Sequence, residues 1–173
     1  MAWQIDTSHS TVGFAVRHMV ISTVRGHFNT FSGTLNIDEV NPANSSVEAE
    51  AEVASIDTRD ANRDNHLRSA DFFDVENYPK ITFKSTSVEK SGDDYKVIGD
   101  LTLHGVTKPV AFDVEYSGII KDPYGLNRAG FTATSKISRK EFGITFNGVL
   151  ETGGAVVGDE VKITLDFEAI SQG

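Results

Sequence analysis

Apolar and polar residues alternate along most of the chain, a period of two that is typical of strands with one buried and one solvated face. The stretch 161–169 shows the pattern most clearly, because its odd positions are apolar and its even positions are polar or charged. The pattern predicts an all-β chain of antiparallel strands. Other segments with the same alternation are 12–16, 47–53, 81–83, 97–103 and 110–114.

Turn-forming residues separate these segments and predict hairpins between neighbouring strands. The sequence Asp-Pro-Tyr-Gly at 122–125 suits a type I turn, and the His-Gly pair at 104–105 marks another reversal. Inside the stretch 24–38, Gly26 and Gly33 interrupt a strand pattern. A missing side chain permits a bend or bulge, so we expect one bent strand there.

One segment has a helical pattern, beginning at residue 57 or 58 and ending near residue 70. Asp57 and Thr58 are both suitable N-cap residues. Asp64 lies four residues before Arg68, an orientation that favours an ion pair along a helix. We therefore expect one short helix, carrying this ion pair, over one end of the fold.

Composition narrows the class of protein. The 173 residues suffice for one domain with its own core, and we take 1–173 as a single domain. The chain has no cysteine, which excludes disulfides, a thiolate nucleophile and cysteine-bound zinc. Its 16 basic and 25 acidic residues give a net charge of -9, which repels nucleic-acid phosphates. Nucleic acid is therefore not expected as a partner.

The first residues, MAWQID, have neither the basic nor the apolar region of a secretory signal, which predicts a cytoplasmic protein. The apolar runs elsewhere are far shorter than the roughly 20 residues that span a bilayer. No integral membrane segment is therefore expected, and any lipid partner must come to the protein.

The buried face of the predicted sheet is rich in large apolar side chains, including most of the 11 phenylalanines. Alternation alone does not separate a β-sandwich from a closed barrel. An eight-stranded barrel either fills its interior with side chains or holds one small ligand. On pattern alone, the phenylalanines are therefore either core or pocket lining.

A series of sequence blocks across nearly the whole chain resembles the YceI-like family of lipid- and polyisoprenoid-binding proteins. The central blocks, NRDNHLRSADFFD at 62–74 and YPKITF at 78–83, are the most specific. The other blocks, in the order of the family, are 3–10, 12–18, 23–28, 55–58, 99–107, 122–125, 138–144 and 157–161.

The resemblance implies an extended eight-stranded antiparallel β-barrel, lipocalin-like in architecture. It implies that a long isoprenoid lipid, of the polyprenyl phosphate or quinone type, occupies the apolar interior for transport, storage or sequestration. It also implies a homodimer, and a binding protein rather than an enzyme, with no cofactor apart from the bound polyisoprenoid lipid.

The hydrocarbon tail of such a ligand is expected among apolar side chains, and its polar head at a barrel rim near Arg17, His18, Arg25 and His27. Arginine suits a phosphate, and imidazole suits a polar head near neutral pH. The expected lining residues are Phe14, Val16, Phe28, Phe83, Leu101, Leu103, Phe112, Phe131, Phe142, Ile144, Leu165 and Phe167.

The sequence leaves two alternatives to lipid binding open, and the first concerns the histidines. His18 and His27 lie in neighbouring motifs, and if they converge they permit an enzyme acting on an isoprenoid substrate. A structural or interaction barrel with a filled core is the other alternative. No metal site is expected, because neither a carboxylate nor a third histidine follows a recognisable ligand spacing.

The helical segment also carries a group of polar residues that invites a catalytic interpretation. We expect instead that they tie the helix to the ends of strands, and that Phe72 and Phe73 anchor it against the barrel. The polar group consists of Arg63, Asp64, His66 and Arg68.

Overall fold

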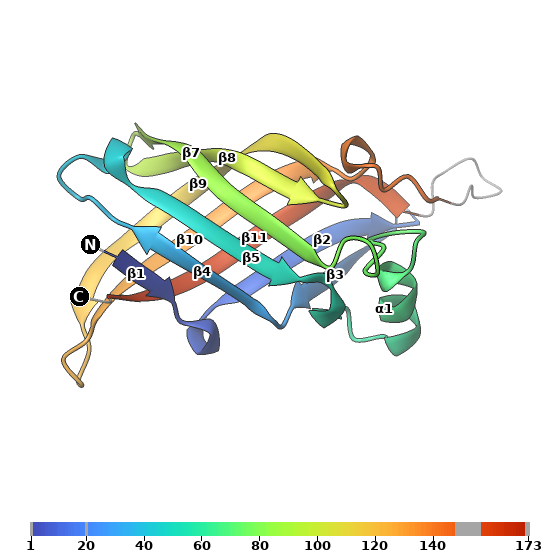
Figure 1. Cartoon of the computed structure of the whole chain (residues 1–173), viewed down its shortest axis with the longest axis horizontal. Helices are drawn as coiled ribbons and strands as arrows, with labels where there is room; N and C mark the ends of the chain where they lie inside the picture. The colour runs from blue at the N-terminus through green and yellow to red at the C-terminus, as the bar shows by residue number, and fades with distance from the viewer. Residues whose placement is uncertain (1, 20, 148–156, 172–173) are drawn as a thin grey trace.

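The computed structural model describes residues 2–19, 21–147 and 157–171. It contains an antiparallel sheet that closes on itself, because the first strand, β1 (Ala2–Ile5), pairs with the last, β11 (Val157–Ser171) (Figure 1). No helix in these residues has the length and apolar character needed to cross a bilayer. The strands are β1 (Ala2–Ile5), β2 (Thr11–His18), β3 (Ser22–Phe28), β4 (Phe31–Asn36), β5 (Ser46–Glu52), β6 (Ile56–Asp57), β7 (Lys80–Ser91), β8 (Asp94–Leu103), β9 (Val106–Lys121), β10 (Asn127–Ser138) and β11 (Val157–Ser171).

Three strands of the barrel are bent, and each consists of two segments. β1 continues into β2, β3 into β4 and β5 into β6, whereas β7 to β11 are continuous. Accordingly β11 pairs with both β1 and β2, while β4 and β3 pair with β5 and β6 respectively. Counted in this way the barrel has eight strands, which confirms the prediction of an eight-stranded antiparallel barrel with one helix.

The bent strand predicted over 24–38 is β3 followed by β4, but the bend does not lie at the glycines. The chain turns at 29–30, between the two segments. Gly26 and Gly33 lie inside strands, where an added Cβ atom would come within 2.5 Å of a side-chain atom of the neighbouring strand. Close packing of a neighbouring side chain, rather than a bend, therefore requires glycine at both positions.

Alternation determines which side chains of each strand face the interior. In β11, Phe167 and Ala169 are buried, whereas Lys162, Thr164 and Asp166 are exposed. A shift of one residue in register would exchange the two faces. The inner face predicted from the alternation in 161–169 is therefore confirmed.

A small apolar cluster lies at the end of the barrel that carries both termini (Figure 1). Trp3 is 1% exposed and packs with Ala129 and Ala169, and Tyr116 and Phe131 lie against this cluster. The buried Trp3 Nε1 has no hydrogen-bond partner among the described residues. The apolar contacts of the ring offset the cost of that unpaired N–H group.

Helix α1 (Ala61–Arg68) lies at the opposite end of the barrel and is shorter than predicted (Figure 1). Its N-cap is Asp60, whose carboxylate accepts hydrogen bonds from the backbone N–H groups two and three residues later. The expected start at 57 or 58 is wrong, because Asp57 belongs to β6 and the Thr58 N–H group donates to a side chain of the helix. The described residues also contain the 3-10 helices η1 (Thr7–His9), η2 (Pro42–Asn44), η3 (Val53–Ser55) and η4 (Lys140–Phe142).

Candidate functional site

The barrel encloses a cavity of about 660 Å³. Its wall extends from Asp38 and Glu39, at the end with the termini, to His66 and Phe146 at the end beside α1, which we call the α1 end. Between the two ends the lining is almost entirely apolar, as in sites for hydrophobic ligands. A filled interior, one of the alternatives left open by the sequence, does not describe this barrel.

Aromatic rings from several strands form much of the wall. Phe83 and Phe112 meet edge to face with their centroids 5.2 Å apart, and Phe31 stacks on Phe167 at 6.2 Å. These arrangements are the favoured ones for aromatic pairs. The predicted site residues that line the cavity are Phe14, Val16, Arg17, His18, Phe28, Phe83, Leu101, Leu103, Phe112, Phe131, Ile144, Leu165 and Phe167.

Three predicted site residues, Arg25, His27 and Phe142, lie away from the cavity. Arg25 and His27 are exposed on the outer face of β3, because the alternate positions Val24, Gly26 and Phe28 face inward. His18 pairs with the first residue of β3, five residues before His27, so the two histidines do not converge. Phe142 is 1% exposed and belongs to the packed core.

The polar groups of the wall differ between the two ends of the cavity. Every arginine and histidine of the lining lies at the α1 end, whereas Asp38 and Glu39 lie at the other end. This distribution favours an anionic or hydrogen-bonding group at the α1 end. The basic lining residues are Arg17, His18, Arg63, His66 and Arg139. The Arg17 guanidinium is directed outward, because Arg17 is exposed and its Nη1 donates to Thr23 Oγ1 at 3.2 Å.

Hydrogen bonds to the segment 54–58 position α1. The buried Asp64 carboxylate accepts from both the N–H group and the hydroxyl of Thr58. Arg63 Nε donates to Thr58 Oγ1 at 2.8 Å, and Arg68 donates to two main-chain carbonyls of the segment. The expected ion pair between Asp64 and Arg68 is wrong because both side chains bond to this segment, although their expected role in tying the helix to strand ends is confirmed.

Three rings of the cavity wall pack together at the α1 end. The centroids of His66 and Phe146 lie 5.1 Å apart, and Phe72 lies 5.0 Å from His66 and 5.2 Å from Phe146. His66 Nε2 also lies 2.9 Å from the Asp71 carboxylate. Phe146 is 42% exposed and also lines the cavity, so this ring meets solvent as well as the cavity.

Arg139 joins two segments of the chain beside this ring cluster. Its guanidinium is almost fully buried and donates to the carbonyls of Ile144 and Phe146, each at 2.9 Å. It also donates to the carbonyls of Gly158 and Val157, at 2.8 and 3.2 Å. Burial lowers the pKa of Arg139 from its ordinary value. A buried cation that bonds backbone carbonyls therefore lies beside the basic end of the cavity.

A tyrosine lines the other end of the cavity. The Tyr116 hydroxyl donates to Glu39 Oε2 at 3.1 Å, and its ring stacks on Phe131 at 5.1 Å. Burial, followed by this hydrogen bond, raises the pKa of Tyr116 well above its ordinary value. The phenol therefore stays neutral and keeps Glu39 in place.

The sequence interpretation missed two groups of lining residues. Ile81, Val114 and Ile163 occupy inward positions of strands, so their alternation could have identified them. Arg139 and Phe146 lie outside the strands, where no periodicity indicates which way a side chain points. Phe72 and Phe73, expected only to anchor the helix, also line the cavity.

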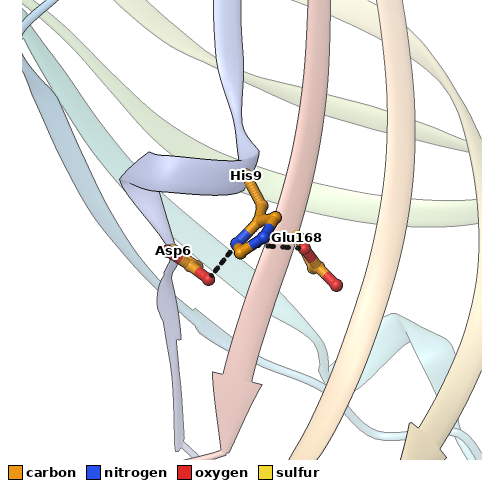
Figure 2. Close-up of side chains that lie close together, drawn as sticks. All are labelled: Asp6, His9 and Glu168. Carbon is orange, nitrogen blue, oxygen red and sulfur yellow. Dashed lines mark hydrogen bonds and ion pairs between the residues drawn. The ribbon is translucent and has the colours of Figure 1, made fainter. Parts of the chain in front are cut away.

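One cluster in the described residues has the side chains of a candidate metal site, and it lies outside the cavity lining. Figure 2 shows the His9 ring between the carboxylates of Asp6 and Glu168; His9 Nδ1 lies 2.8 Å from Asp6 Oδ2 and 3.7 Å from Glu168 Oε2. Arg128 Nη1 already donates to the same Asp6 oxygen at 2.8 Å, and it holds the pKa of Asp6 well below its usual range. A bound cation would have to displace this guanidinium, so the cluster is explained as a link between strands.

Comparison with known proteins identifies the family to which this barrel belongs. A family model described as "YceI-like domain" matches residues 3–169. The chain belongs to the YceI-like domain family. Protein YceI of Escherichia coli strain UMN026 is 43% identical over 167 residues, which cover 96% of this chain and 84% of that protein. The YceI-like blocks in the sequence therefore indicated the family correctly.

Solved structures support the same YceI-like barrel. Burkholderia cenocepacia BcnA superposes with a TM-score of 0.84 and 25% identity, covering 95% of this chain and 98% of BcnA. A Saccharophagus degradans domain described as polyisoprenoid-binding superposes with a TM-score of 0.71 over 98% of both chains. Its 14% identity shows a shared fold.

Proposed function

We propose that this protein binds a long isoprenoid lipid in the barrel cavity and carries or stores it. The observation that supports this most directly is the cavity of about 660 Å³, apolar along its length and basic at one end only. Apolar burial contributes roughly 25 cal/mol per Å², so a long chain binds well with few polar contacts. The polyisoprenoid-binding description of the Saccharophagus degradans domain supports this class of ligand.

We further propose that the polar head of the lipid lies at the α1 end. His18, Arg63 and His66 line that end, and charge-assisted hydrogen bonds from such groups favour a phosphate. A prenyl phosphate should therefore bind more tightly than the matching prenol. The Arg63→Gln variant should lose most of this difference, which titration calorimetry at low and high salt would measure. Equal affinities for phosphate and alcohol in the unsubstituted protein would contradict a phosphate site.

The decisive experiment identifies the lipid that the protein carries. The protein would be purified without detergent and extracted with organic solvent, and the extract would be analysed by mass spectrometry. We expect a prenyl lipid in the extract, and a higher Tm when prenyl lipid is added to the stripped protein. Repeated absence of any lipid, together with an unchanged Tm, would contradict the proposed function.

A homodimer is the assembly that we propose, following the family resemblance. Ile120 and Tyr124, in and after β9, are 66% and 89% exposed and offer apolar surface for a second copy. Light scattering should then give twice the 18.8 kDa mass of one chain. A mass of one chain at all concentrations would contradict the dimer.

A further inference from the structure

Phe14 and Gly26 are directly opposite each other in the β2–β3 pair, on the inner face of the barrel. Gly26 is buried, and a Cβ atom added there would lie 2.5 Å from Phe14 Cζ and 2.9 Å from Phe14 Cε1. Carbon atoms in ordinary contact lie about 3.5–4.0 Å apart. The ring of Phe14 therefore occupies the space that any side chain at position 26 would need.

The other neighbours of Gly26 and Phe14 leave little room for adjustment. The Cγ2 atom of Thr58 would lie 2.8 Å from the added Cβ, and Thr58 is 2% exposed and bonded to Asp64 and Arg63. The Phe14 ring packs against Phe28 with centroids 5.6 Å apart. Because Phe14 also lines the cavity, the open direction for its ring is into the cavity.

We propose that the Phe14–Gly26 pair sets the width of the cavity beside α1 and thereby determines which hydrocarbon chains fit. Glycine at 26 lets the Phe14 ring lie against the wall, which leaves room for a methyl-branched chain. Phe14 contacts the chain, and Gly26 is a positioning residue that acts through Phe14. This inference rests on the proposed function and adds a basis for choosing a branched over a straight chain.

The test compares two alcohols of the same main-chain length: geranylgeraniol, which carries a methyl branch on each isoprene unit, and straight-chain cetyl alcohol. Affinities would be measured on lipid-free protein by displacement of the fluorescent probe N-phenylnaphthylamine. In Gly26→Ala the Phe14 ring must move inward by about an ångström. We expect affinity for geranylgeraniol to fall by about tenfold or more, the usual effect of one misfitting methyl-sized group, and affinity for cetyl alcohol to change far less.

Two further variants isolate the role of Phe14. Adding Phe14→Leu to Gly26→Ala should restore affinity for geranylgeraniol, because the smaller side chain clears the added methyl group. Gly13→Ala is the matched control, since a Cβ there would make only ordinary contacts of 3.5 Å or more, and it should leave both affinities unchanged. Phe14→Trp, made in the unsubstituted chain, enlarges the same ring and should also disfavour the branched alcohol if Gly26→Ala does not fold.

The possible results separate this inference from the proposed function. Equal losses for both alcohols in a folded Gly26→Ala variant, or no recovery in the double variant, would overturn the inference while lipid binding stands. If Gly26→Ala does not fold, unchanged selectivity in Phe14→Trp would overturn it in the same way. Failure of the unsubstituted protein to bind either alcohol would overturn the proposed function itself.

Discussion

Arg128 Nη1 donates a 2.8 Å hydrogen bond to the Asp6 carboxylate, which joins β10 to the bend between β1 and β2. Arg128 Nε donates to Asp122, also at 2.8 Å. One guanidinium therefore bonds two carboxylates and contributes to the closure of the barrel. Charge-assisted bonds of this kind are stronger than neutral ones.

The bonds from Arg128 predict acid sensitivity. Arg128 is the main cause of the lowered pKa of Asp6 and of Asp122. A carboxylate whose pKa is lower in the folded chain than in the unfolded chain stabilises the fold at any pH above its unfolded pKa. This contribution is lost as the pH falls through the pKa of the folded chain. We therefore expect the Tm to fall progressively below about pH 4. Thermal melts followed by circular dichroism would measure it.

Arg128→Gln should lower the Tm at neutral pH and have a smaller effect in acid, where both carboxylates become protonated. Lys84→Gln is the control, because the pair of Lys84 with Glu48 is highly exposed and exposed pairs contribute little. An equal loss of Tm by Arg128→Gln at neutral and acid pH would contradict the electrostatic explanation.

The buried Asp64 predicts a local stability effect. Asp64→Ala removes the acceptor of two hydrogen bonds from Thr58 and leaves a buried N–H group unpaired, which costs about 1–3 kcal/mol. Urea unfolding would measure the free energy of unfolding. Asp60→Ala removes the N-cap and a long, exposed ion pair with Arg63, with an expected cost of about 1 kcal/mol. A smaller loss for Asp64→Ala than for Asp60→Ala would argue against its anchoring role.

The aromatic wall predicts that a charge inside the cavity abolishes lipid binding. Phe83→Asp places a carboxylate against the Phe112 ring, and a buried unpaired charge disfavours an apolar chain beside it. We expect at least a tenfold loss of prenyl-lipid affinity in a folded variant. Ala111→Asp, on the exposed face of β9, is the matched control and should bind normally. Unchanged binding by folded Phe83→Asp would show that Phe83 does not contact the ligand.

The ring cluster at the α1 end predicts an effect on the rate of release. Phe146→Ala removes the half-exposed ring that contacts His66 and Phe72, so bound lipid should leave faster. Transfer of a fluorescent prenyl lipid to acceptor vesicles would measure the release rate. Ile21→Ala, which removes a side chain that is 80% exposed between β2 and β3, should leave the rate unchanged. Identical rates for the two variants would place the exit elsewhere.

The sequence predicted the strands and their inner faces well, because alternation follows directly from which side of a strand meets water. The error at His27 has the same physical origin. Phe28 and His27 are neighbours in a strand, so they face opposite sides, and Phe28 faces inward. Gly26, between Arg25 and His27, has no apolar side chain to mark an inward position. The alternation that would have placed Arg25 on the outer face was therefore hard to recognise.

The residues at the α1 end could not be predicted in this way. Arg139 and Phe146 reach the cavity from a segment without regular periodicity, held by hydrogen bonds to backbone carbonyls. Asp64 bonds to Thr58 rather than to Arg68 because the helix packs on the chain before it. The directions of these side chains and the partner of Asp64 depend on tertiary contacts, which the spacing of residues along the sequence does not reveal.

The three bent strands also have a mechanical consequence. The breaks at 6–10, 29–30 and 53–55 divide strands in one half of the wall, whereas β7 to β11 are undivided and their ladders carry local register shifts, at 85–87 in β7 and beside Gly130 in β10. Two of these breaks are joined to each other, since the Asn29 N–H group donates to the Ser55 carbonyl at 3.1 Å. Because β1 to β6 are divided by these breaks, we expect that half of the barrel to be the one that changes its diameter when a lipid enters.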